Sequence, residues 1–299
     1  MTDLIVICGP TGSGKTDLAI DLAIKLNTEI ISADSMNIYK GFDIGTAKPS
    51  LEELSKVKHH LIDVCDGNDT FSVSDYEKQA LPIINDLISK GKIPIIVGGT
   101  GFYINSLLYG LSYGNSAKNE EIREKYNQMA NEFGVEKVFE RLKEIDPDTA
   151  EKLHPNDLKR VIRAIEIFET AGQKKSEIVD DLTPRFNYKA YMIDFDRKVL
   201  YDRINKRVDI MFEKGLVDEV KNLLSSGVKK DAQSMQGIGY KEVVEFLENA
   251  ITFDELTEKI KQNTRRYAKR QITFFKRLDG LNYLKPTKML SKEIIENLW

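Results

Sequence analysis

Short apolar runs alternate with longer amphipathic stretches over the first hundred residues of the chain. The runs at residues 4–8, 29–33 and 93–97 have the length and composition of strands that are buried on both faces. Residues 17–26, which follow the first run, repeat apolar side chains at helical spacing. Strands that alternate with helices in this way predict a doubly wound parallel sheet, and therefore an α/β fold.

The pattern changes between about residues 115 and 183 of the sequence. This stretch is rich in charged residues, has no strand-like run, and predicts helices over 120–133, 135–145 and 156–171. We therefore predict an all-helical insertion domain at residues 114–185. The α/β core would then combine residues 1–113 with residues 186–299.

Beyond the insertion the sequence returns to the pattern of the core. Residues 191–195 predict another buried strand, and helices are expected over 199–224, 241–248 and 253–278. No internal repeat or low-complexity tract interrupts this order. The second half of the core is thus expected to add one strand and several helices to the sheet.

The overall composition restricts the partners of the chain without choosing one. Its 299 residues are 41% hydrophobic and 30% charged, with a formal net charge of −3, so a nucleic-acid partner requires local basic patches. The apolar runs are too short for a signal peptide or a bilayer span, and Cys8 and Cys65 lack metal-ligand spacing. We expect a cytoplasmic monomer that has free thiols and no membrane segment.

A glycine-rich loop stands between the first predicted strand and the first predicted helix. The stretch GPTGSGKT satisfies G-x-x-x-x-G-K-[ST] in the position that a phosphate loop requires. Backbone amides and the helix N-terminus would hold phosphate oxygens, the lysine would add a full charge, and the threonine hydroxyl would hold Mg²⁺. The predicted phosphate-binding residues are Gly9, Pro10, Thr11, Gly12, Ser13, Gly14, Lys15 and Thr16, with Thr16 as the metal ligand.

Two further predicted strands end in residues that are able to act on a bound ligand. Asp34 follows the strand at 29–33 and is a candidate magnesium ligand or general base. Thr100 follows the strand at 93–97 between two glycines, which let the backbone approach a ligand closely. Because ligands of parallel sheets bind at the carboxyl ends of the strands, we expect Asp34 and Thr100 beside the phosphate loop.

Two basic patches on predicted helices point to a polyanionic partner. On the helix at 253–278, six cations fall within an arc of about 140°, with Tyr267, Phe274 and other apolar residues opposite. The cations are Arg265, Arg266, Lys269, Arg270, Lys276 and Arg277. Lys159, Arg160 and Arg163 form a second basic edge within the insertion. Uncompensated cations on an acidic chain favour contact with RNA or DNA.

Two classes of function remain open from these residues. A small-molecule or nucleoside kinase needs the phosphate loop, magnesium and a catalytic aspartate, but not two basic helical faces. An ATP-driven RNA-remodelling protein needs nucleotide hydrolysis, and no glutamate follows Asp194 to activate water.

Several longer stretches resemble bacterial tRNA dimethylallyltransferases, a family also called tRNA isopentenyltransferases. The most specific are ADSMNIYKGFDIGTAKP and VGGTGFYINSLLYG, and HPNDLKRVIRAIEIFETAG, QGIGYKE and RRYAKRQITFFKR also match. The resemblance implies a phosphate-loop fold with a helical insertion. It also implies that the loop holds dimethylallyl diphosphate rather than ATP, and that the prenyl group passes to N6 of the tRNA adenosine just 3′ of the anticodon.

The resemblance also implies roles for single residues. Asp34 would be the base near the adenine amine, Thr100 would contact the oxygen between prenyl carbon and diphosphate, and Arg207 would support the diphosphate, with Mg²⁺ as cofactor. Contacts to the tRNA anticodon stem-loop are implied for Asp34, Ser35, Met36, Asn37, Thr100, Arg123, Lys159, Arg160, Val161, Ile162 and Arg163. We add Arg265, Arg266, Lys269 and Arg270 from the basic helical face.

Overall fold

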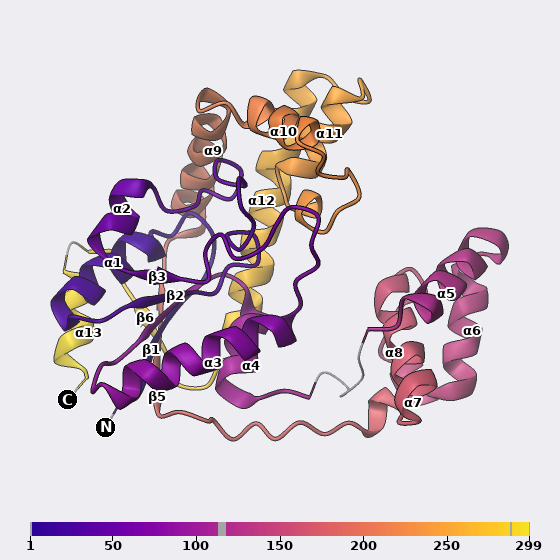
Figure 1. The fold of residues 1–299 in the computed structure, drawn as a ribbon, viewed down its shortest axis with the longest axis horizontal. Helices are drawn as coiled ribbons and strands as arrows, with labels where there is room; N and C mark the ends of the chain where they lie inside the picture. The colour runs from indigo at the N-terminus through magenta and orange to yellow at the C-terminus, as the bar shows by residue number, and fades with distance from the viewer. Residues whose placement is uncertain (1, 113–117, 288, 299) are drawn as a thin grey trace. The chain divides into compact units, whose positions relative to one another are not determined.

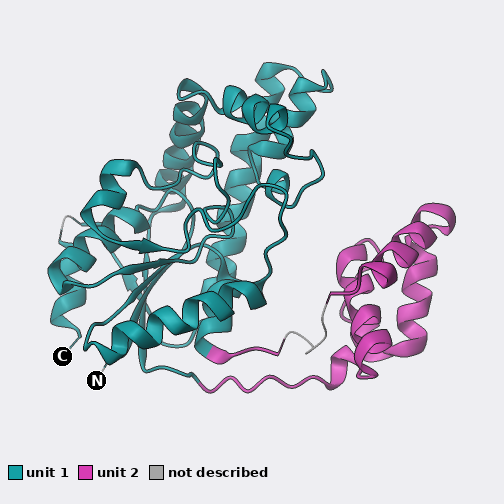
Figure 2. Cartoon of the chain, in the orientation of Figure 1, with its two compact units in different colours: residues 1–108, 184–299 teal, residues 109–183 magenta. Residues whose placement is uncertain are grey.

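The computed structural model describes residues 2–112, 118–287 and 289–298 of the chain. The chain divides into two compact units, drawn in different colours in Figure 2. One unit combines Met1–Leu108 with Pro184–Trp299, and the other is Tyr109–Thr183. The second unit is therefore an insertion within the first, and each is described by itself.

The larger unit is built on a six-stranded parallel sheet with the order β3-β2-β4-β1-β5-β6 (Figure 1). Every pair of neighbouring strands is parallel, which confirms the predicted α/β fold. The strands are β1 (Leu4–Cys8), β2 (Ile30–Ser32), β3 (His59–His60), β4 (Ile95–Gly98), β5 (Tyr188–Ile193) and β6 (Leu281–Leu284).

The register of the sheet brings the ends of three strands to one edge. Cys8 of β1 pairs with Gly98 of β4, and Val97 of β4 pairs with Ser32 of β2. Because these strands are parallel and adjacent, the loops that follow them leave the sheet side by side. The phosphate loop, Asp34 and Thr100 lie on these loops.

Both faces of the sheet are covered, as the continuous apolar runs require. Ile5 and Ile7 share one core with side chains of α1 (Lys15–Leu26) and with Ile294 of α13 (Leu290–Glu296). Val6, which alternates with them, is equally buried. The remaining helices in the first part of the unit are α2 (Leu51–Lys56), α3 (Val73–Ser89) and α4 (Gly101–Tyr109).

The helices that follow β5 pack on one another beside the loops at the strand ends. Leu200 and Ile204 of α9 (Arg197–Glu213) contact Ala268 of α12 (Phe253–Phe275). The single helix predicted at 199–224 is wrong, because Gly215 adopts φ 93° and separates α9 from α10. The other elements here are α10 (Leu216–Ser225), a 3₁₀ turn at Ser234–Gln236, and α11 (Tyr240–Leu247).

The insertion is all-helical over its described residues. It contains α5 (Glu120–Phe133), α6 (Val135–Ile145), α7 (Pro147–Ala150), α8 (Leu158–Ala171) and a 3₁₀ turn at Lys175–Glu177. One core, which includes Tyr126, Phe139 and Ile165, holds its helices together. Within the described parts of both units, no helix has both the length and the apolar composition of a bilayer span.

Candidate active site

The phosphate loop has the backbone conformation that its glycines allow. Gly9, Gly12 and Gly14 adopt φ values of 126°, 79° and 83°, which disfavour residues with a side chain. A Cβ atom on Gly9 would also lie 2.8 Å from the Met192 side chain of β5. Lys15 begins α1, so the loop presents the N-terminus of a helix to its ligand.

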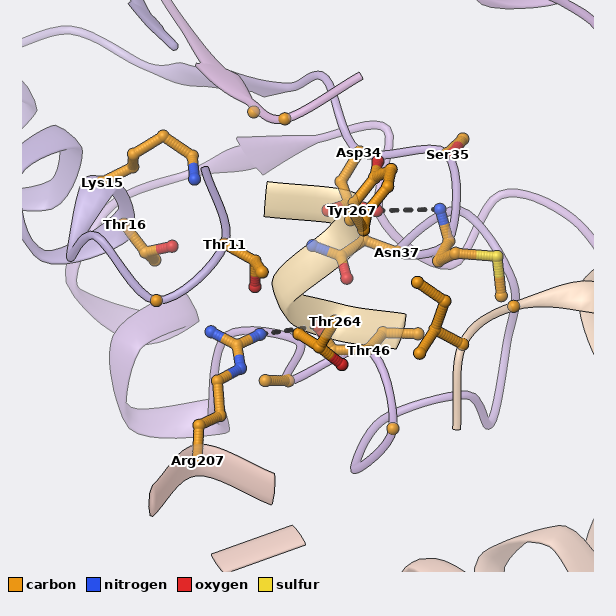
Figure 3. A pocket seen from close by; sticks show the side chains of 18 of the residues that line it. Thr11, Lys15, Thr16, Asp34, Ser35, Asn37, Thr46, Arg207, Thr264 and Tyr267 are labelled. Atoms are coloured by element: carbon orange, nitrogen blue, oxygen red, sulfur yellow. Dashed lines mark hydrogen bonds between the residues drawn. The ribbon is translucent and has the colours of Figure 1, made fainter. Parts of the chain in front are cut away.

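An open cavity of about 780 Å³ extends from this loop along the edge of the sheet. Lys15, Thr16 and Asp34 line it, together with residues of α9 and α12. In Figure 3, Thr11, Lys15, Thr16 and Arg207 lie on one side of the cavity, and Asp34 and Tyr267 lie on the other. The structure thus brings the predicted phosphate loop and the predicted base into one cavity.

Two cations from different elements face the phosphate side of the cavity. Lys15 Nζ donates to the Pro10 carbonyl at 2.6 Å, and Arg207 of α9 donates to the Thr46 carbonyl at 3.1 Å. Burial, followed by the nearby Arg207 charge, lowers the pKa of Lys15 to about 8, and Asp34 opposes this shift. Burial also lowers the pKa of Arg207, again against Asp34. Two cations that burial destabilises make a site that favours a bound polyanion.

Two more basic residues of α9 reach the same cavity and were missed in the sequence. Arg203 Nε donates to the Gly12 carbonyl of the phosphate loop at 2.7 Å, and its guanidinium lies over the Phe195 ring. Lys206 lines the cavity beside Arg207. Arg203, Lys206 and Arg207 are spaced three and four residues apart, so they lie on one face of a helix. This spacing is the feature of the sequence that predicts a shared basic surface.

The candidate base is held in place by the backbone that follows it. Asp34 Oδ1 accepts the Met36 amide at 2.9 Å, which leaves Oδ2 for a ligand. The Ser35 amide donates to Thr100 Oγ1 at 3.0 Å, so Thr100 is tied to the same turn. Thr100 is not among the residues that line the cavity, whereas Ser35, Met36 and Asn37 are.

Tyr267 of α12 is a cavity residue rather than the apolar-face residue that the helical pattern predicted. It lines the cavity together with Arg270, whose guanidinium lies 5.6 Å from the Tyr267 ring centroid. Burial and the nearby Asp34 carboxylate raise the pKa of Tyr267 to about 12. The phenol therefore stays protonated beside Asp34 and can donate a hydrogen bond.

The remaining cations of α12 lie away from the cavity lining. Arg265 donates to Asn205 of α9 at 2.6 Å, while Arg266 and Lys269 are exposed. Lys276 and Arg277 follow the end of α12 at Phe275, so the predicted helical face is shorter than expected. Arg270 is the member of this group that reaches the cavity.

The insertion holds its predicted RNA-contacting residues in two different environments. Lys159 and Arg160 are exposed on α8. Val161 and Ile162 are 0% and 4% exposed within the helical core, so their predicted contact with RNA is wrong for the side chains. Their positions on α8 face the neighbouring helices rather than solvent.

Arg123 and Arg163 are bound to a buried carboxylate that the sequence did not reveal. Glu166 is fully buried and accepts Arg123 Nε at 2.9 Å, Arg163 at 2.6 Å and the Asn119 amide at 2.7 Å. Burial raises the pKa of Glu166, but the hydrogen bonds from both arginines outweigh it and hold the pKa below its ordinary value. Two cations on one carboxylate leave a net positive charge at this edge of the insertion.

Comparison with known proteins was consistent with this arrangement. A family model described as IPP transferase matches residues 37–278. The tRNA dimethylallyltransferases of Thermoanaerobacter sp. (strain X514) and Acetivibrio thermocellus are both 48% identical to the chain. The first alignment covers 99% of this chain and 97% of the relative, and the second covers 100% and 96%.

The chain belongs to the IPP transferase family.

Solved structures of IPP transferases have the same fold. The full-length tRNA isopentenylpyrophosphate transferase of Bacillus halodurans superposes with a TM-score of 0.74 at 40% identity, covering 99% of this chain and 95% of that one. A eukaryotic dimethylallyltransferase acting on tRNA gives a TM-score of 0.83 at 31% identity, covering 98% and 77%. The IPP transferase match therefore extends over both units of the chain.

Proposed function

We propose that this protein transfers the dimethylallyl group of dimethylallyl diphosphate to N6 of the tRNA adenosine that follows the anticodon, adenosine 37. One observation carries the proposal: the Asp34 carboxylate lines the same cavity as the cationic phosphate cradle of Lys15 and Arg207. Membership of the IPP transferase family supports it. The relatives named above are tRNA dimethylallyltransferases.

The chemistry of the acceptor explains why a carboxylate is needed. The exocyclic amine of adenine is a weak nucleophile because its lone pair is delocalised into the ring. As N6 bonds to the allylic carbon, the carbon–oxygen bond to diphosphate breaks and its electron pair leaves with the diphosphate. Asp34 Oδ2, the oxygen not used by the Met36 amide, takes the proton that N6 loses.

The cradle stabilises the charge that builds on the leaving diphosphate. The loop amides, Lys15 and Arg207 already lie around the cavity before the reaction. Reorienting these groups as charge develops in the transition state therefore costs little free energy. Losing one such donor typically costs about 3 kcal/mol of transition-state stabilisation. For Thr100 to contact the bridging oxygen, its hydroxyl must exchange its bond with the Ser35 amide for one with the ligand, since Thr100 does not line the cavity here.

The residues of the cradle also fit a magnesium ion. Thr16 lines the cavity at the N-terminus of α1, and Asp17 lies next to it. No group of three or more acidic, histidine or cysteine residues with metal-binding geometry occurs among the described residues. A hydroxyl with a neighbouring carboxylate suits Mg²⁺, which takes one or two protein ligands and completes its shell with phosphate oxygens and water. When bound, the ion would neutralise part of the charge of the diphosphate.

The acceptor adenosine must leave the anticodon loop to reach this cavity. Bases in a loop are unpaired, so extruding one costs little, and Ser35, Met36 and Asn37 line the cavity where it would enter. Exposed cations of α12 and of the insertion would bind phosphates and fix the position of the RNA without reading its sequence. We propose these cations, above all Lys159, Arg160 and Arg270, as tRNA contacts.

One experiment separates this function from its rivals. The protein is incubated with magnesium, unmodified tRNA and labelled dimethylallyl diphosphate, and in parallel with labelled ATP. The proposal predicts label in the RNA from the prenyl donor alone, and none in a transcript with guanosine in place of the target adenosine. Phosphate transfer to a small acceptor would instead indicate a kinase, and ATP hydrolysis without RNA labelling would indicate a remodelling protein.

A further inference from the structure

A buried glutamine of α12 joins two of the loops that form the site. The Thr11 amide of the phosphate loop donates to Gln271 Oε1 at 2.9 Å. Gln271 Nε2 donates to the Gly99 carbonyl at 2.9 Å. The side chain is 5% exposed, so both bonds are sheltered from water. Gln271 therefore spans the gap between the loop after β1 and the loop after β4.

The residues at the two ends of this bridge have separate parts in the proposed reaction. Thr11 belongs to the loop that would seat the diphosphate, and Gly99 directly precedes Thr100. Thr100 makes two hydrogen bonds to the segment that carries Asp34. Its amide donates to the Ala33 carbonyl, and its hydroxyl accepts the Ser35 amide. One line of hydrogen bonds thus runs from the phosphate loop to Asp34.

The space around Gln271 matches this side chain closely. A Cβ atom at position 99 would lie 2.0 Å from Gln271 Nε2, so only glycine fits beneath the amide. Replacing the amide by an apolar group would leave the Thr11 amide and the Gly99 carbonyl buried without partners, which the local backbone would relieve by moving. The two loops would then shift relative to each other.

We propose that Gln271 is a positioning residue that fixes the distance between the diphosphate seat and the pair Thr100 and Asp34. This proposal rests on the proposed function. Gln271 lines the cavity, but its two hydrogen bonds go to the Thr11 amide and the Gly99 carbonyl of the backbone, so its proposed part is to hold these loops. Misplacing reacting groups by about 1 Å costs roughly 100-fold in rate, so the effect is expected on turnover rather than on binding.

Three variants test this role against a simple loss of stability. Gln271→Leu keeps most of the volume and loses both bonds, whereas Gln271→Glu keeps the acceptor for Thr11 and loses the donor to Gly99. Gln79→Ala is the control, since Gln79 is an exposed glutamine on α3 outside the cavity lining. Single-turnover prenyl transfer, the Kd of inorganic diphosphate and the thermal midpoint are measured for each.

The proposal expects the Gln271→Leu rate to fall by roughly 30- to 100-fold with the diphosphate Kd within about threefold of wild type. The Gln271→Glu rate should fall between those of Gln271→Leu and wild type, and Gln79→Ala should match wild type. Rates within threefold for Gln271→Leu, or equal losses in rate and diphosphate affinity, would overturn it. If Gln271→Leu does not fold, a Gln271→Glu rate equal to wild type overturns it. An inactive wild type would instead refute the proposed function.

A separate observation concerns an exposed phenylalanine next to Thr100, Phe102, which packs against the half-buried Phe274. Phe102 of α4 is 56% exposed, and its ring centroid lies 5.6 Å from that of Phe274 on α12 at an interplanar angle of 58°. A Cβ atom on Gly101 would lie 2.2 Å from the Phe274 ring, so this ring lies directly against the backbone after Thr100. Large exposed apolar groups beside a site indicate a binding surface.

The charges around this pair indicate what binds there. Arg270 lies one helical turn before Phe274, and Arg277 lies just beyond the end of α12, and both are exposed. Cations that flank an exposed ring suit a partner with phosphates and flat bases, which is single-stranded nucleic acid. We infer that Phe102, supported by the half-buried Phe274, stacks against an unpaired tRNA base next to the target adenosine.

Substitutions at Phe102 separate stacking from simple apolar contact. Phe102→Ala and Phe102→Leu should raise the KM for an anticodon stem-loop by about 5- to 100-fold with the salt dependence unchanged, and Phe102→Tyr should match wild type. Tyr283→Ala, at an exposed aromatic residue on β6, is the control. A KM for Phe102→Leu equal to that of wild type would exclude stacking, and so would an unchanged KM for Phe102→Ala.

Discussion

The buried ammonium of Lys15 predicts that the affinity for the prenyl donor depends on pH. Its pKa of about 8 means that the empty site carries a neutral amine in mildly alkaline solution. The shift from 10.5 corresponds to roughly 3 kcal/mol of destabilisation of the protonated form, because one pKa unit is about 1.36 kcal/mol. A bound diphosphate provides the opposite charge and so restores the protonated form.

The direction of the effect follows from linkage. Well below pH 8 the ammonium is already present and binding takes up almost no proton at Lys15. Above pH 8 the diphosphate must bind together with a proton, so its Kd rises up to tenfold per pH unit until the pKa of the bound state is reached. At pH 9 about 0.9 of a proton should be taken up at Lys15 for each diphosphate bound.

Titration calorimetry with inorganic diphosphate in buffers of different ionisation enthalpy measures this uptake directly. The ligand also titrates, and the Lys15→Arg variant corrects for it because an arginine stays charged throughout the range. Lys15→Met has no charge at this position at any pH. As the pH rises and Lys15 loses its proton, the wild-type Kd for diphosphate should approach the Kd of Lys15→Met. Identical proton uptake by wild type and Lys15→Arg between pH 7 and 9.5 would refute the reasoning.

Three other predictions follow from the site and the insertion. Asp34→Asn and Thr100→Ala should each lower kcat by roughly ten- to a thousandfold while the Kd for tRNA, measured by filter binding, stays nearly constant. Glu166→Gln removes the buried partner of two arginines and should destabilise the protein by about 3 kcal/mol in urea unfolding, and the contribution of Glu166 to wild-type stability should be lost only as the pH falls below about 4.5. Lys269→Ala with Arg270→Ala should weaken tRNA binding and reduce its salt slope by up to about two.

The parts of the fold that depend on local patterns were predictable from the sequence. The run Leu4–Cys8 is apolar at every position because both faces of β1 are covered, and GPTGSGKT needs its glycines for positive φ. Strand order was not needed to place Asp34 and Thr100 at one edge, because all parallel strands end at the same edge. Each of these features can be recognised from a stretch of ten residues or fewer.

The features that were missed depend on contacts between distant segments. Strand β6 is only four residues long, and two of them, Asn282 and Tyr283, are exposed, so it shows no apolar run. The sequence of α8 alone gives no sign that Glu166 is buried. Its burial depends on Arg123, which lies more than 40 residues earlier in the sequence and donates to it. The break between α9 and α10 rests on Gly215 alone, and a single glycine within a helical pattern is weak evidence for an end.

The ligand of the phosphate loop is determined by what faces the loop rather than by the loop itself. The motif supplies amides, a lysine and a hydroxyl, which serve any di- or triphosphate equally well. Arg207 of α9 and Tyr267 of α12 complete the cavity around Asp34, and both belong to helices that follow the insertion in sequence. Asp194, where a magnesium-binding carboxylate of a nucleotide hydrolase would be sought, is exposed and outside the cavity lining. Asp34 lies across this cavity from two cations, where a carboxylate is suited to take a proton from an amine as a diphosphate leaves.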